Sequence, residues 1–165
     1  MLDSTSCSTN QDSINCRSGI ATGRTMLAAL NLGADGVQIG SRFVASDESS
    51  AHAAFKNEVV AAKEGDTILT LKELTPVRLI KNEFYSSIDE AYKNGASTSE
   101  LKTLLGRGRA KKGMFEGNIK EGELEIGQIS GLINEIKPAA QIVDEIVSEY
   151  RTALKEQDGF KFHFS

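Results

Sequence analysis

The sequence predicts an α/β fold: the end of a parallel β-barrel followed by a mainly helical C-terminal extension. Glycine-rich turns begin at Gly19 and at Gly40, and a helix–strand unit lies between them. Alternation of strand, short turn and helix is typical of parallel sheets. Predicted strands are few and lie mostly in the first half, whereas most of the later chain has helical periodicity. Because a complete parallel sheet needs more strands, we interpret the chain as the last part of a barrel.

The first 17 residues stand apart from the rest. They are rich in Ser, Asn, Asp and Thr and have no hydrophobic periodicity, so we expect coil. Only residues 14–16 could form a stub of strand. A glycine turn that opens a helix normally follows a buried apolar strand, and the sequence pattern shows no such strand before Gly19. We therefore expect residues 1–18 to be a disordered or non-native leader.

The next elements surround the two glycine turns. After Thr22, several apolar residues share one helical face, and Gly33 stands where a helix C-cap favours positive φ. Residues 34–39 then form an apolar run that predicts a short strand. Ser41 follows this run and is a good N-cap for another short helix.

The remaining elements are predicted from periodicity and from Gly and Pro breakers. They are a helix over 49–63, a brief strand over 67–71, an extended or turn-like segment over 76–80, helices over 82–93, 98–105 and 109–115, a polar loop over 119–127, a helix over 128–136 and a last helix from Pro138. The last helix is the clearest, and its apolar residues predict one buried side: Ile142, Val143, Ile146, Val147, Tyr150 and Leu154. Residues 157–165 are expected to be a loose tail.

Composition excludes several classes of protein. A net charge of −4 argues against a nucleic-acid-binding surface, and we interpret the basic run at 107–112 as a solvated helix face. No apolar run approaches the roughly 20 residues that cross a bilayer, and the N-terminus lacks the features of a signal peptide. Cys7 and Cys16 have no metal-ligand spacing, so we expect a reduced, cytoplasmic protein with incidental thiols and no metal site.

The two glycine turns predict a phosphate-binding site. Both turns precede helices, and the strand–turn–helix pattern places their backbone N–H groups at the same end of a sheet. Such N–H clusters bind phosphate in α/β proteins. Arg24 and Arg42 lie nearby, but surface salt bridges or packing explain them equally well, so we leave both out of the site.

Several motifs, in the right order, resemble those of one enzyme family, the nitronate monooxygenases, whose close relative is the flavin-dependent enoyl-acyl-carrier-protein reductase. The resemblance spans about residues 19–155 and rests on these segments: GIATGR at 19–24, GADGVQIGSRF at 33–43, ESSAH at 48–52, TPVRLIKN at 75–82, GNIKEG at 117–122 and GQISGLI at 127–133. One departure is Ser18, which stands where the family usually has a second glycine.

The resemblance implies the C-terminal portion of a TIM-type (β/α)8 barrel over residues 19–156, with flavin mononucleotide (FMN) as the cofactor. In such barrels a phosphate sits at the loops after the last two strands. Carried over by position, Gly19 would offer its N–H to the phosphate. Four further residues would line the cofactor, with Ser41 at the phosphate: Gln38, Ile39, Gly40 and Ser41.

The activity that the resemblance implies is FMN-dependent oxidation of alkyl nitronates with O2. An enoyl-acyl-carrier-protein reductase that uses NADH and an enoyl thioester stays open as an alternative, as does a non-catalytic remnant whose apolar surface favours a homo-oligomer. The family's catalytic histidine would lie upstream of Gly19. His52 and His163 are the histidines present, neither lies in that motif, and we nominate no catalytic residue.

Overall fold

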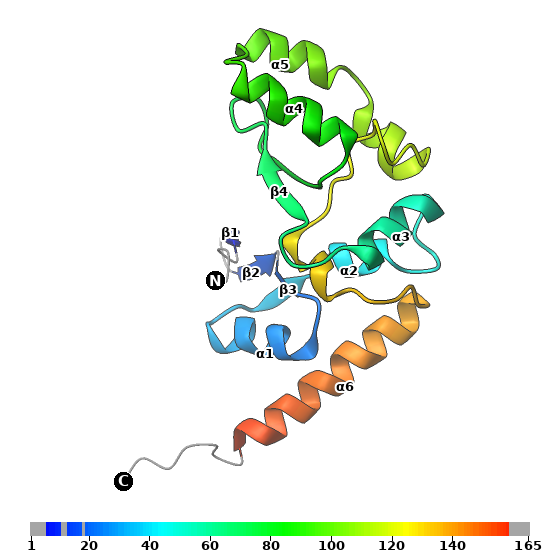
Figure 1. The fold of residues 1–165 in the computed structure, drawn as a ribbon. Coiled ribbons are helices and arrows are strands. Elements are labelled where there is room, and N and C mark those ends of the chain that lie inside the picture. Colours follow the sequence, from blue (N-terminus) through cyan, green and yellow to red (C-terminus); the bar gives the residue numbers. More distant parts are fainter. Residues whose placement is uncertain (1–5, 11–12, 18, 159–165) are drawn as a thin grey trace. The chain divides into compact units, whose positions relative to one another are not determined.

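The computed structural model describes residues 6–10, 13–17 and 19–158 and divides the chain into two compact units. The first unit combines residues 1–48 with residues 137–165, and the second comprises residues 49–136. Figure 1 shows the elements of both units. Each unit is described by itself below.

A three-stranded sheet of order β1-β2-β3 forms the centre of the first unit. Strand β1 (Ser6–Asn10) pairs antiparallel with β2 (Ser13–Arg17), and β2 pairs parallel with β3 (Gly36–Gln38). The expectation of coil over residues 1–17 is therefore wrong where the structure describes them. The strand expected to be missing before Gly19 is β2, which contains the predicted stub at 14–16.

The N-terminal strands carry too few apolar residues for a sequence pattern to reveal them. Cys16 is buried, with 2% of its surface exposed, and packs with Ile20, Ala29 and Ala34. It also takes part in a disulfide bond. Cys7, the other cysteine of the sequence, stands opposite Cys16 in the register of β1 and β2. The prediction of incidental thiols is wrong for Cys16.

Two helices flank β3 in the sequence. Helix α1 (Gly23–Asn31) begins after a capping box of Thr22 and Thr25, and the four-residue α2 (Ser41–Val44) follows β3. Gly33 has a φ of 96°, as the C-cap prediction required. Ser41 is the first residue of α2 rather than its N-cap; Gly40 occupies the cap position, and the helix has no side-chain cap.

The long helix α6 (Ala139–Asp158) packs against α1 (Figure 1). Ile142, Ile146 and Ala153 are buried, but Val143 and Leu154 keep 47% and 39% of their surface exposed. The single buried side predicted for this helix is therefore too wide. The helix also extends to Asp158, two residues into the predicted tail, and residues 159–165 lie outside the described part.

The second unit joins a two-stranded antiparallel sheet to short helices. Its core cluster contains Leu71, Leu79, Phe84 and Ile88. The elements are α3 (Ala53–Ala61), β4 (Thr67–Thr70), β5 (Val77–Ile80), α4 (Glu83–Lys93), α5 (Thr98–Leu105), the π-helix η1 (Lys111–Phe115) and the 3₁₀-helix η2 (Gln128–Leu132).

The predicted elements of this unit agree in type with the structure except at two helices. Residues 109–115 form a π-helix over only the last five residues, and residues 128–136 form a short 3₁₀-helix. Helix α3 starts at Ala53, four residues later than predicted, and His52 caps it. No helix among the described residues is long and apolar enough to span a membrane.

Candidate functional site

The two glycine turns lie side by side at the carboxyl edge of β2 and β3. Arg17 and Gln38 are paired at the ends of these parallel strands. Gly19 follows Arg17 by two residues, and Gly40 follows Gln38 by two residues. Because neighbouring strands lie about 4.8 Å apart, equivalent positions after paired parallel strands are close in space. The sheet register thus brings the predicted site residues to one edge.

Gly19 and Gly40 both face open space. A Cβ built on either residue would meet no heavy atom within 4 Å, and both residues are exposed. Gly19 has a φ of 73°, so its backbone conformation itself favours glycine. Gly40 has a φ of −108°, which any residue adopts. Neither backbone conformation nor internal packing therefore accounts for glycine at position 40, whereas close approach of a ligand would.

Two neighbouring glycines have a different role. A Cβ on Gly23 would lie 2.1 Å from the backbone N of Tyr150, and one on Gly36 would lie 2.7 Å from Oδ1 of Asn15. Gly23 thus allows α1 and α6 to approach closely, and Gly36 makes room for a side chain of β2. The motif at 19–24 divides into one open glycine and one packing glycine.

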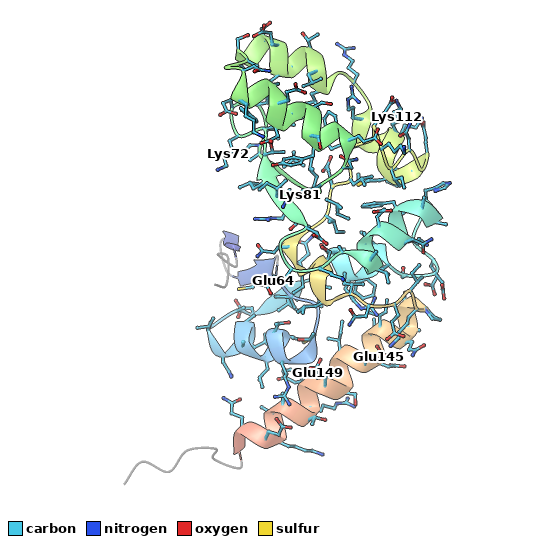
Figure 2. All side chains as sticks on the ribbon, viewed as in Figure 1. Glu64, Lys72, Lys81, Lys112, Glu145 and Glu149 are labelled. Atoms are coloured by element: carbon cyan, nitrogen blue, oxygen red, sulfur yellow. The ribbon has the colours of Figure 1, made fainter. Side chains whose placement is uncertain are left out.

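The N-terminus of α1 is satisfied within the protein. The N–H of Gly23 donates to Oε2 of Glu149 at 2.8 Å, and the N–H of Thr25 donates to Oγ1 of Thr22 at 3.2 Å. Figure 2 shows Glu149 on α6. Arg24 pairs with Glu156 at 2.8 Å, in agreement with the surface salt bridge considered for it. A bound anion at this edge would therefore use Gly19 and the start of α2 instead.

The other predicted site residues surround the start of α2. Gln38 is exposed at the end of β3, Ser41 is half-buried, and Ile39 packs its side chain against the buried cluster around Cys16. Ile39 could thus present backbone atoms to a ligand while its side chain holds the loop in place. The structure brings Gly19, Gln38, Ile39, Gly40 and Ser41 together; their binding of a cofactor stays a prediction.

His52 has a structural role in the second unit. Its Nδ1 accepts a hydrogen bond from the N–H of Ala54 at 3.1 Å, which caps α3. A Cβ on Gly117 would lie 2.3 Å from the same Nδ1, so the imidazole ring packs directly over the Gly117 backbone. His163 lies outside the described residues. Within the described part, no group of three or more His, Cys, Asp or Glu residues could hold a metal ion.

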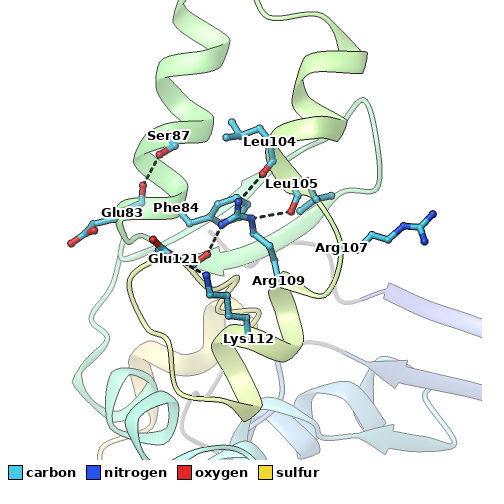
Figure 3. A pocket seen from close by; sticks show the side chains of 10 residues that line it. Glu83, Phe84, Ser87, Leu104, Leu105, Arg107, Arg109, Lys112 and Glu121 are labelled. Carbon is cyan, nitrogen blue, oxygen red and sulfur yellow. Dashed lines mark hydrogen bonds and ion pairs between the residues drawn. The ribbon is translucent and has the colours of Figure 1, made fainter.

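A cavity of about 460 Å³ opens beside α4 and α5 (Figure 3). Arg109 lies over the ring of Phe84, 4.5 Å from its centroid, and donates to the carbonyls of Leu104, Leu105 and Glu121 at 2.8–3.0 Å. Lys112 is paired with the Glu121 carboxylate. The interpretation of residues 107–112 as a solvated face is therefore wrong for Arg109, whose side chain connects α5 to the following loop.

Glu123 is a strongly perturbed carboxyl group that the sequence analysis did not single out. It is 7% exposed, and burial, together with the nearby charge of Glu125, raises its pKa to about 7 despite the opposing charge of Arg109. The alternation of residues 123–126 predicts an extended segment with Leu124 and Ile126 buried, but it would place Glu123 on the exposed side, so it gave no signal for the burial of Glu123. This segment pairs with β5, since the N–H of Ile80 donates to the carbonyl of Leu124.

Comparison with protein families identifies the chain. The sequence model of the family described as nitronate monooxygenase matches residues 16–149. The chain belongs to the nitronate monooxygenase family. The match begins at Cys16, within β2 and three residues before the boundary predicted at Gly19. Membership supports an oxidoreductase as the class of activity.

Individual relatives agree with this assignment. A probable nitronate monooxygenase from Staphylococcus saprophyticus is 32% identical over 133 residues, which cover 79% of this chain and 37% of the relative. One from Bacillus subtilis is also 32% identical and is covered over 38% of its length. The chain thus spans well under half the length of these nitronate monooxygenases.

Two solved enzyme structures are similar in fold to this chain. FabK from Thermotoga maritima matches 88% of this chain and 46% of its own, with 37% identity and a TM-score of 0.80. A nitroalkane oxidase from Streptomyces ansochromogenes matches with 25% identity and a TM-score of 0.67, covering 90% of this chain and 42% of its own. The α/β class is confirmed. Both neighbours are TIM-barrel enzymes, and this nitronate monooxygenase family chain covers less than half of each.

Proposed function

We propose that this chain forms the phosphate-binding part of an FMN-dependent oxidoreductase of the nitronate monooxygenase type. The N–H of Gly19 and the N–H and hydroxyl of Ser41 bind the phosphate. Gly40 lets the cofactor approach the backbone, and Gln38 and Ile39 line it. Membership of a family of flavoenzymes supports a flavin, and the open carboxyl edge of β2 and β3 supports a phosphate-bearing one.

The single observation that carries this proposal is the open space at Gly40. Its glycine is required neither by φ nor by a neighbouring atom. The N-terminus of α2 has no side-chain cap. The N-terminus of α1, by contrast, already binds the carboxylate of Glu149 through the N–H of Gly23. The residues present therefore fit a phosphate held by the start of α2 and the turn at Gly19.

The proposed reaction is oxidation of an alkyl nitronate with O2 to a carbonyl compound and nitrite. When bound, the flavin supplies the ring that accepts electrons and reacts with dioxygen. The residues of this chain bind and orient the phosphate end of the cofactor. We assign no catalytic base to the described residues, because His52 caps α3 through its Nδ1.

Flavin titration of the purified chain tests the site. We expect FMN to bind with a change in its visible absorbance, and Gly40→Val to weaken binding at least tenfold, about 1.4 kcal/mol, because the new side chain fills the approach to the backbone. Since a Cβ there meets nothing in the protein, Gly40→Val should melt at the temperature of the wild-type chain. Val substituted for the exposed Asn31 serves as a matched control that should bind FMN normally.

Several outcomes separate the alternatives. Unchanged FMN affinity in Gly40→Val would contradict the site. A colourless chain that does not respond to added FMN would favour a non-catalytic remnant. If FMN binds, nitrite formation and oxygen uptake with an alkyl nitronate support the proposed reaction, whereas NADH oxidation with an enoyl thioester supports the reductase.

A further inference from the structure

Helix α6 carries two apolar rows, and only one of them is buried. Ile142, Ile146 and Ala153 form the buried row on the side of α1. The second row follows the spacing i, i+4, i+7, i+11, which is typical of a helix that packs against another helix. We name it the outer row: Val143, Val147, Tyr150 and Leu154. Its end residues Val143 and Leu154 are exposed, so the outer row offers apolar surface beyond what α1 covers.

Two opposite charges border the outer row. Asp144 and Arg151 are both exposed and lie seven residues apart, so they differ by only about 20° around the helix. Neither forms an ion pair with any residue that the structure describes. Two other charges on α6, both labelled in Figure 2, already have partners: Glu149 accepts from the N–H of Gly23, and Glu145 pairs with Lys137.

We propose that the outer row is the interface of a homodimer in which two copies of α6 pack antiparallel across a two-fold axis next to Ser148. In this arrangement Asp144 of each copy faces Arg151 of the other, and Val143 of each copy faces Leu154 of the other. The midpoints of both pairs fall within one residue of Ser148.

The charge pattern selects a second copy in antiparallel orientation. A two-fold interface joins the same patch on both subunits, so residue i must complement residue j and the reverse. Asp144 and Arg151 satisfy this condition when the helices run in opposite directions, because an antiparallel two-fold pair brings the same flank of both helices together. A parallel pair would instead place this flank against the opposite flank of the partner helix, so the two charges would not meet. The surface therefore complements itself.

Analytical ultracentrifugation of the 165-residue chain tests the dimer. We expect a monomer–dimer equilibrium in the micromolar range, with Val147→Glu raising the dissociation constant at least tenfold. Thr152→Glu, an exposed substitution on the opposite side of the same helix, adds the same charge and should leave the equilibrium unchanged. Circular dichroism shows whether each variant keeps the helical content of the wild-type chain.

Charge reversal gives a second, independent test. Asp144→Arg and Arg151→Asp should each weaken the dimer, and the combined variant should restore it, because each reversal alone places like charges opposite each other. A wild-type chain that is monomeric at about 100 μM, far above a micromolar dissociation constant, overturns the proposal. A dimer that ignores Val147→Glu, or a double variant no better than the singles, overturns it as well.

Discussion

At the scale of single residues, glycines of one motif region have different physical roles: some face open space, and others allow close packing. Gly40 is surrounded by open space at a φ that any residue adopts, while Gly23 is closed in by the backbone of α6. The sequence suggested a cluster of phosphate-binding glycines, and it correctly predicted that the two turns share one sheet edge. It could not separate binding from packing, because that difference depends on contacts with residues more than 100 positions away.

Glu123 gives a prediction of pH dependence. Its pKa is about 7 in the folded chain, above the value of an exposed glutamate, so folding favours the protonated form. Stability should then decrease as pH rises from about 4.5 through 7, since the folded state must hold a charge in a buried place. Glu123→Gln should be about 2 kcal/mol more stable than wild type at pH 8 and equal to it at pH 4.

Urea unfolding at several pH values measures this effect. Glu64→Gln provides the control, because Glu64 is exposed and its substitution removes the same charge without removing a buried one. Parallel stability curves for wild type and Glu123→Gln across this pH range would contradict the buried, protonated state of Glu123.

At the scale of elements, helices with complete local signals were predictable from sequence. Helix α5 agrees with its predicted bounds because Ser97 and Glu100 form a capping box that defines its start. Strand β2 was reduced to a stub because its sequence SINCR is mostly polar, and pairing with both β1 and β3 makes it a strand. Such pairing connects segments far apart in sequence and leaves little trace in local periodicity.

The contact between α1 and α6 gives a prediction at this scale. Gly23→Ala should destabilise the first unit by about 3 kcal/mol, because the added Cβ would overlap the Tyr150 backbone nitrogen and force the helices apart. The Gly23–Glu149 hydrogen bond would be strained by the same shift. Gly40→Ala is the matched control, since its Cβ meets nothing and should change stability by less than about 0.5 kcal/mol. Thermal unfolding followed by circular dichroism compares the two, and equal melting temperatures would show that α1 and α6 do not cross this closely.

At the scale of the whole molecule, the family could be recognised from ordered motifs, whereas the complete barrel could not be derived from this chain. The motifs at 33–43, 75–82 and 127–133 fall in both units, so membership does not depend on one segment. The two described sheets have three and two strands, and the chain covers 46% of FabK, so the described residues do not form a complete barrel. The candidate site is consequently limited to groups that hold a phosphate.

Cofactor binding should therefore protect one unit and not the other. Because the five candidate residues all lie in the first unit, we expect FMN to slow amide hydrogen exchange at residues 19–44 and to leave residues 83–121 unchanged. At a concentration of about 100 times the dissociation constant, linkage predicts about 2.7 kcal/mol of added stability for the unit that binds. Hydrogen-exchange mass spectrometry with and without FMN measures both regions in one sample. The Gly40→Val variant is the control, because any change in exchange that FMN produces there does not come from the proposed site. Protection around the cavity at Arg109 instead of the turns at Gly19 and Gly40 would move the cofactor site to the second unit and contradict the proposed phosphate site.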